Sequence, residues 1–364
     1  MTEERDIAGF ASVFAAGILA ASFIPYRQIH ATGLSASFFL LFSMVPLMRR
    51  KIGRFHLAIQ WTSMFSAAFL TGICCWCAAC IHDISSLHIA SAIESFSLAS
   101  CARLRAAINS VPFADPNSEA ILTAFLTGDR SALSSDLKEA FRQSGAAHLL
   151  ALSGMHLGII YAMFSKLLSI LGNQLSIKKI RSLTILLFCG IYTLGTGAGE
   201  SITRAFLFIM LNEIGRMTHR KTSLKEIMMA ALLIQLTIEP TAIRSVSFQL
   251  SYAAMAGIAF IHPRLKGFWP GEGSGVMRKI WEAASLTISC QLGTAPLAWF
   301  HFRSFPINFL ITNLIAMPLT SLLIPLSIIT ICLHATGICP ACLIDATEFL
   351  ISLLCRSIEA IAAI

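Results

Sequence analysis

The chain has 364 residues, of which 56% are hydrophobic and only 13% charged, with a formal net charge of +8 and a mean hydropathy of +0.74. Soluble domains usually carry about 25% charged residues, so this composition excludes an ordinary water-soluble fold. It predicts an all-α, polytopic helical membrane protein. The positively charged residues are clustered in a few loops. Short cytoplasmic loops of membrane proteins usually collect Lys and Arg, and this explains the clusters more simply than nucleic-acid binding does.

Apolar runs are frequent enough to predict about 9–11 membrane spans. A helix needs about 20 residues to cross the hydrocarbon core, so the runs at 182–196, 202–215 and 226–239 are expected to be tilted or re-entrant. The predicted runs are 7–24, 33–48, 57–81, 147–171, 182–196, 202–215, 226–239, 246–261, 281–299, 306–332 and 341–363.

The basic loops set the predicted topology. With a cytoplasmic N-terminus, alternation places the loops 49–56, 172–181, 216–225 and 262–280 inside, and each contains a cluster of Lys and Arg. The run at 7–24 lacks a small-residue cleavage site and is predicted to be a retained first span. The side on which the C-terminus lies stays open, because a re-entrant segment would change the later topology.

Three regions are expected along the chain. Residues 1–81 hold N-terminal transmembrane helices, and 82–120 form an extracytoplasmic linker with an amphipathic helix over Ser91–Val111. Residues 121–364 form the main transmembrane domain. At the start of that domain we expect a helix capped by Asn117 or Ser118 and ended by Gly128, then a short helix capped by Ser134 or Ser135.

The eleven cysteines are predicted to be structural for the most part. Cys74, Cys75, Cys77 and Cys80 lie in an apolar run without polar neighbours, where free cysteine packs as a small hydrophobic residue. The second group, Cys339-Pro340-Ala341-Cys342, has redox-motif spacing but no βαβ pattern around it. Its role stays open, and no metal site or cofactor is expected.

Polar residues run from Gly128 to Gly158 directly into an apolar run. Polar groups at membrane depth are costly and are usually functional. If residues 147–171 form one helix, His148, Ser153 and His156 share a broad stripe, and Gly154 and Gly158 allow another backbone to approach. The stripe could face a hydrated path, or it could only supply hydrogen bonds between helices.

Several motifs follow in a fixed order along the chain. They are G-D-R-S at Gly128–Ser131, H-L-L-A-L-S-G-M-H at His148–His156, S-I-T-R-A-F-L-F at Ser201–Phe208, S-F-Q-L-S-Y-A-A-M-A-G at Ser247–Gly257, Q-L-G-T-A-P-L at Gln291–Leu297 and N-L-I-A-M-P-L at Asn313–Leu319. In order and separation this set resembles the membrane competence domain of the ComEC family, the inner-membrane channel for DNA uptake in natural competence.

The resemblance implies a channel that passes single-stranded DNA into the cytoplasm during transformation. It implies a DNA path at six positions, although Arg204 could equally form a structural ion pair with Glu200 and a glutamine could simply tie helices together. The six are His148, Ser153, His156, Arg204, Gln249 and Gln291. Four extracytoplasmic arginines are expected at the DNA entrance: Arg103, Arg105, Arg130 and Arg142.

Two departures from the family limit the expectation. Relatives commonly carry an OB-fold-like domain, and the 82–120 linker stands in its place. No H-x-H-x-D-H cluster is present, so no metallo-β-lactamase-like domain and no enzymatic activity are expected. No P-loop is present either. We therefore expect a separate DNA receptor, a cytoplasmic helicase or ATPase, and in some systems a separate nuclease, beside membrane lipid and the DNA strand.

Other functions remain open. A degenerate ComEC-like scaffold or a small-solute transporter would share the composition, although no convincing internal repeat supports a transporter. A remote alternative is an intramembrane serine protease that uses Ser153. On a continuous helix, His156 at position i+3 is expected to point its imidazole away from the Ser153 hydroxyl.

Overall fold

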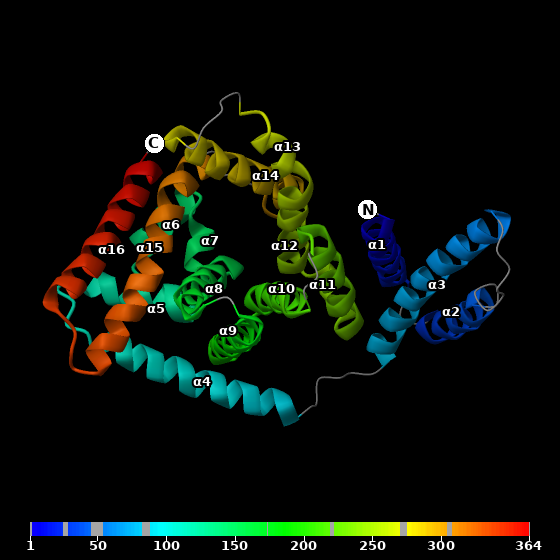
Figure 1. Cartoon of the computed structure of the whole chain (residues 1–364), viewed down its shortest axis with the longest axis horizontal. Coiled ribbons are helices and arrows are strands. Elements are labelled where there is room, and N and C mark those ends of the chain that lie inside the picture. Colours follow the sequence, from blue (N-terminus) through cyan, green and yellow to red (C-terminus); the bar gives the residue numbers. More distant parts are fainter. Residues whose placement is uncertain are drawn as a thin grey trace. The chain divides into compact units, whose positions relative to one another are not determined.

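The computed structural model describes residues 2–24, 28–44, 54–81, 88–172, 174–218, 222–269, 275–303 and 308–363, and all regular structure in these ranges is helical (Figure 1). The all-α prediction is confirmed. The chain divides into two compact units, one made of Met1–His88 and Arg220–Tyr252, the other of Ile89–His219 and Ala253–Ile364. Each of the four basic loops lies partly outside the described residues.

Within the described residues the predicted apolar runs fall on helices, although the run 147–171 is divided between Ala147–Leu150 and Gly154–Leu168. Within the described ranges, three stretches are long and apolar enough to cross a membrane: Trp61–Cys80, Gly154–Leu171 and Phe309–Ala335. These stretches agree with a membrane protein. The larger predicted number of spans, about 9–11, stays a prediction, as do the predicted domain boundaries.

The first unit is held together by direct backbone contact between two helices. It contains α1 (Thr2–Ser22), α2 (Ile29–Met44), α3 (Arg54–Ile81), α11 (Leu224–Ile238), η4 (Pro240–Arg244) and the first part of α12 (Val246–Ala256). A Cβ atom on Gly17 would lie 2.1 Å from the carbonyl oxygen of Phe69, and one on Gly72 would lie 2.3 Å from that of Phe14. Because lipid does not drive helices together, such close packing supplies much of the attraction between α1 and α3.

The second unit contains the residues of the predicted motif. Its elements are α4 (His88–Asn109), α5 (Pro116–Thr127), α6 (Ser135–Gln143), α7 (Ala147–Leu150), α8 (Gly154–Leu168), η3 (Ser169–Leu171), α9 (Leu175–Gly195), α10 (Glu200–Met217), η5 (Gly257–Ile261), α13 (His262–Lys266), α14 (Val276–Phe302), α15 (Phe309–Ala335) and α16 (Ala341–Ala362). Helices α15 and α16 pack side by side, and α15 also contacts α8. Phe125, Phe141 and Leu149 are fully buried in the core.

Local capping chemistry sets the ends of α5 and α6. The predicted cap of α5 at Asn117 or Ser118 is wrong: the Asp115 carboxylate accepts the N–H of Asn117 at 2.9 Å, and Pro116 occupies the first helical position. Proline suits that position because its missing N–H needs no partner there. Gly128 ends α5 with φ 81°, and Ser134 caps α6, both as predicted.

A second pair of backbones meets inside the larger unit. A Cβ on Gly257 would lie 2.2 Å from the carbonyl oxygen of Ser289, and one on Gly293 would lie 2.3 Å from that of Ala253. Gly257 opens η5, a single π-helical turn that follows α12. The two glycines therefore fix α14 against this turn.

We expect Gly257→Ala to lower the free energy of unfolding by about 1–3 kcal/mol, because its methyl group would overlap the Ser289 carbonyl. Gly158→Ala is the matched control, since no atom lies within 4 Å of its added Cβ and a helical alanine gains up to about 1 kcal/mol. Thermal unfolding in detergent measures both. Equal stability of the two variants would contradict the close contact.

Candidate functional site

The predicted helix over residues 147–171 is broken at its motif. Helix α7 ends at Leu150, the backbone is extended at Ala151 (ψ 132°) and Ser153 (ψ 166°), and α8 begins at Gly154. The prediction of one continuous stripe is therefore wrong. The physical reason is that serine favours the N-cap position, where its polar atoms replace helical hydrogen bonds.

His156 completes this cap from inside α8. The Ser153 N–H donates to His156 Nδ1 at 3.2 Å, and the Ser153 hydroxyl lies 3.1 Å from the same atom. His156 thus plays the part that Glu or Gln plays in a capping box. The expectation that its imidazole points away from the hydroxyl is also wrong, because the helix begins only after Ser153.

The ring of His156 is fully buried. It meets the Phe125 ring edge-on, with centroids 5.6 Å apart. Because a backbone N–H donates to Nδ1, the neutral ring carries its proton on Nε2. Among the described residues no hydrogen-bond partner faces Nε2. His156 therefore joins the cap of α8 to α5, and it does not face an open channel.

His148 lies on the other side of the break and contacts α15. Its Nδ1 is 3.0 Å from the Gly145 carbonyl oxygen, and its ring centroid is 5.4 Å from that of Phe309. One turn further along α15, the Thr312 hydroxyl donates to the Ser144 carbonyl at 2.6 Å. The segment before the break is therefore anchored to the start of α15.

Helix α10 covers the first turn of α8. A Cβ on Gly154 would come within 2.9 Å of the Ala205 Cβ, as expected for a close approach, whereas Gly158 has open space around it, and the expectation for that glycine is wrong. Arg204, next to Ala205, is only 2% exposed and pairs with Glu200 at 3.6 Å. The structure thus brings His148, Ser153, His156 and Arg204 into one region.

The two glutamines are on other helices, α12 and α14. Gln249 is in the first unit, where its side-chain amide donates to the Ile243 carbonyl at 2.9 Å and so fixes the turn before α12. Gln291 lies half-buried on α14.

Two of the four predicted entrance arginines are engaged in ion pairs. Arg105 pairs with Asp129, and Arg142 binds the Glu139 carboxylate through two nitrogens at 2.6 and 2.8 Å. Arg142 lowers the pKa of Glu139 to about 2, so this pair is ionised at neutral pH. Within the described chain, the side chains of Arg103 and Arg130 are exposed and have no acidic partner.

A buried carboxylate was missed from the sequence. Glu213 of α10 is fully buried and accepts from the Tyr161 hydroxyl at 2.6 Å, the Ser182 hydroxyl at 2.5 Å and Arg216 at 3.0 Å. Asn212 donates in turn to the Tyr161 oxygen at 3.1 Å. This network, here called the Glu213 network, joins α8, α9 and α10. The one available signal was an acidic residue inside the apolar run 202–215.

The described cysteines form neither a disulfide nor a metal site. Within the described ranges all eleven are free thiols, and no group of His, Cys, Asp and Glu is arranged to hold a metal ion. Cys339 is half-buried and Cys342 is exposed. The described structure assigns neither of them a role.

These features define a class: a helical membrane protein in which a half-buried, hydrogen-bonded helix break directly precedes a long apolar helix. The family model described as "Competence protein" matches residues 125–364, about two thirds of the chain. The chain therefore belongs to the competence protein family. The match begins in α5 and includes the break, the Glu213 network and the contact of α8 with α15.

Two curated relatives match part of this chain. ComE operon protein 3 of Bacillus subtilis is 25% identical over 210 residues, which cover 58% of this chain and 25% of the relative. Uncharacterized protein YcaI of Escherichia coli is 24% identical over 228 residues, covering 60% of this chain and 29% of the relative. The chain thus spans under a third of the length of either relative. No solved structure matches it.

We expect Tyr161→Phe to lower the free energy of unfolding by about 1.5–3 kcal/mol, the range for a hydrogen bond to a charged group. Tyr252→Phe is the control, because its hydroxyl donates to the neutral Gln235 amide at 3.3 Å, a bond in the range of about 0.5–1.5 kcal/mol. Denaturant unfolding in detergent measures both. A larger loss for Tyr252→Phe would show that Glu213 is not charged in the fold.

Proposed function

We propose that this protein passes single-stranded DNA through the bacterial inner membrane into the cytoplasm during natural competence. Membership of the competence protein family supports the general role. The observation that carries the proposal is the break at Ala151–Ser153, which directly precedes a helix apolar enough to cross a membrane.

Non-helical backbone at membrane depth is stable only where protein buries it or where it lines a hydrated path. His156 and α10 bury part of the break with protein. Half-buried Ser153 and His148 offer polar atoms that can line a hydrated path. A moving strand needs many weak contacts, because one tight site would hold it. In this mechanism His156 positions the break, while Ser153 and His148 contact the strand.

The exposed arginines Arg103 and Arg130 attract the strand at the extracytoplasmic entrance. Phosphates are drawn to cations that are not already neutralised, and Arg105 and Arg142 have acidic partners. Arg204 pairs with Glu200 on α10, the helix that covers the break, and supports it there. Gln249 and Gln291 remain proposed path residues.

The proposal includes a multi-pass arrangement with a cytoplasmic N-terminus. A separate DNA receptor delivers the strand, a cytoplasmic helicase or ATPase supplies the work, and a separate nuclease acts where one strand must be degraded. The protein itself is proposed to be a conduit and not an enzyme, with no cofactor.

One observation favours a second candidate, the intramembrane serine protease. The Ser153 hydroxyl lies 3.1 Å from His156 Nδ1, within reach for a nucleophile and its base. Two observations weigh against it: Nδ1 already accepts the Ser153 N–H, and no described carboxylate orients Nε2. Labelling of Ser153 by a serine-directed phosphonate, lost in His156→Ala, would favour the protease over the conduit.

Transformation of a competent deletion strain tests the proposed function. We expect the wild-type chain to restore transformation and His156→Ala, at equal membrane level, to leave it near the deletion value, because the cap of α8 would be lost. His334→Ala, in the last turn of α15 and outside the break, is the matched control. Full rescue by His156→Ala would remove the break from the DNA path, and uptake of DNA into the cytosol without the chain would refute the channel.

The proposed entrance is tested by salt dependence. Each phosphate contact contributes about 0.7 to the slope of log affinity against log salt for a single strand, so Arg103→Gln with Arg130→Gln should reduce that slope by about 1.4. The control pair Arg105→Gln with Arg142→Gln should change it less, since both arginines already have acidic partners. Binding of a labelled oligonucleotide to the purified chain measures the slopes. An unchanged slope in the first pair would place the entrance elsewhere.

A further inference from the structure

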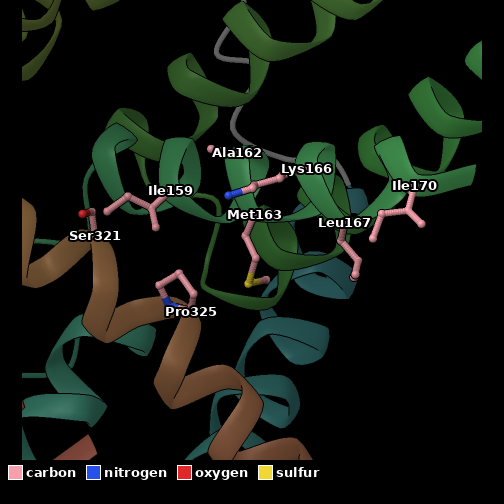
Figure 2. Close-up of a pocket in the computed structure, with 8 residues that line it drawn as sticks. All are labelled: Ile159, Ala162, Met163, Lys166, Leu167, Ile170, Ser321 and Pro325. Atoms are coloured by element: carbon pink, nitrogen blue, oxygen red, sulfur yellow. The ribbon is translucent and has the colours of Figure 1, made fainter. Parts of the chain in front are cut away.

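We propose that the pocket between α8 and α15 binds an anionic phospholipid. The pocket has a volume of about 540 Å³, and α8 and η3 form one wall while α15 forms the other (Figure 2). Its lining residues are Ile159, Ala162, Met163, Lys166, Leu167, Ile170, Ser321 and Pro325. This pocket is distinct from the break and from the Glu213 network.

The lining suits acyl chains. Six of its eight side chains are apolar, and Leu167 and Ile170 among them are 56% and 81% exposed. In a chain that spans a membrane, such an exposed apolar rim belongs against lipid. A water-filled path would leave this surface in contact with water at a hydrophobic cost.

Lys166 supplies one positive charge within this apolar lining. Figure 2 shows its amine directed along α8 toward Ile159, and not toward the end of the helix at Ile170. A lysine near the end of a spanning helix usually extends its amine outward to the interface. Within the described chain Lys166 has no acidic partner, whereas Lys266 pairs with Glu282 at 3.0 Å. The charge of Lys166 is therefore available to a phosphate.

The opposite wall offers an acceptor. Pro325 lies inside α15 and has no N–H to donate to the carbonyl of Ser321, the residue four positions before it. The Ser321 hydroxyl is itself occupied, because it donates to the Pro318 carbonyl at 2.7 Å. The pocket thus combines a cation with a backbone carbonyl that lacks its helical donor. A lipid headgroup with both a phosphate and free hydroxyl groups, as in phosphatidylglycerol, matches both: the phosphate pairs with the cation and a hydroxyl donates to the carbonyl.

A DNA strand fits this pocket poorly. Strand binding uses several cations along a groove and aromatic side chains on which bases stack. The lining contains one cation and no aromatic residue. A DNA strand and an anionic phospholipid both carry phosphate, but the apolar walls of the pocket favour the lipid.

The test uses the purified full chain in nanodiscs that contain phosphatidylglycerol and phosphatidylcholine. Lipid retained after transfer to detergent is counted by native mass spectrometry. We expect the wild type to retain phosphatidylglycerol and Lys166→Gln to bind it about fivefold more weakly, the usual effect of one basic residue near a membrane surface. Lys179→Gln, exposed on α9, is the matched control and should behave as the wild type.

A second variant, Ala162→Phe, fills the pocket and should expel both lipids without changing thermal unfolding in lipid-free detergent. Equal retention by the wild type and Lys166→Gln, or unchanged retention in Ala162→Phe, would overturn the proposal. Displacement of phosphatidylglycerol by a single-stranded oligonucleotide would also overturn it and assign the pocket to the strand. Because binding is measured without transport, failure here is independent of the proposed channel.

Discussion

A polypeptide can interrupt a helix within an apolar environment only if the freed backbone groups find partners. In this protein the imidazole of His156 is such a partner: it takes the N–H of Ser153, while its far edge packs on Phe125. The start of α8 follows from this cap, and the close approach of α10 at Gly154 and the anchoring of the preceding segment to α15 also hold the broken segment in place. The imidazole of His156 thereby replaces a backbone carbonyl as the acceptor for this N–H.

Burial distinguishes residues that hold the site in place from residues that can contact a ligand. Full burial gives His156 and Arg204 supporting roles, whereas Ser153 and His148 keep partly accessible polar atoms. Among the four proposed entrance arginines, Arg105 and Arg142 have acidic partners, whereas the other two are exposed without one. The number of arginines in the sequence is therefore larger than the number that can bind a phosphate.

Much of the fold was predictable, because apolar runs and turn residues such as Gly128 and Ser134 act locally. The break was not, since the usual capping pattern expects Glu or Gln where this chain has His156. Glu213 was missed for another reason: its partners come from three segments whose proximity no local pattern encodes. The motif order did identify the family, and it placed four of the six proposed path residues together. It gave no sign that Gln249 would bind a carbonyl near its own helix.

The Glu213 network also constrains the order in which its members can change during evolution. Loss of Tyr161 or Ser182 first would leave a buried carboxylate with too few donors, which is strongly destabilising. Loss of the carboxylate first is milder, because Arg216 is 43% exposed and can reach polar surroundings. Related sequences should therefore rarely keep the acid without its donors, while donors without the acid can persist as neutral remnants.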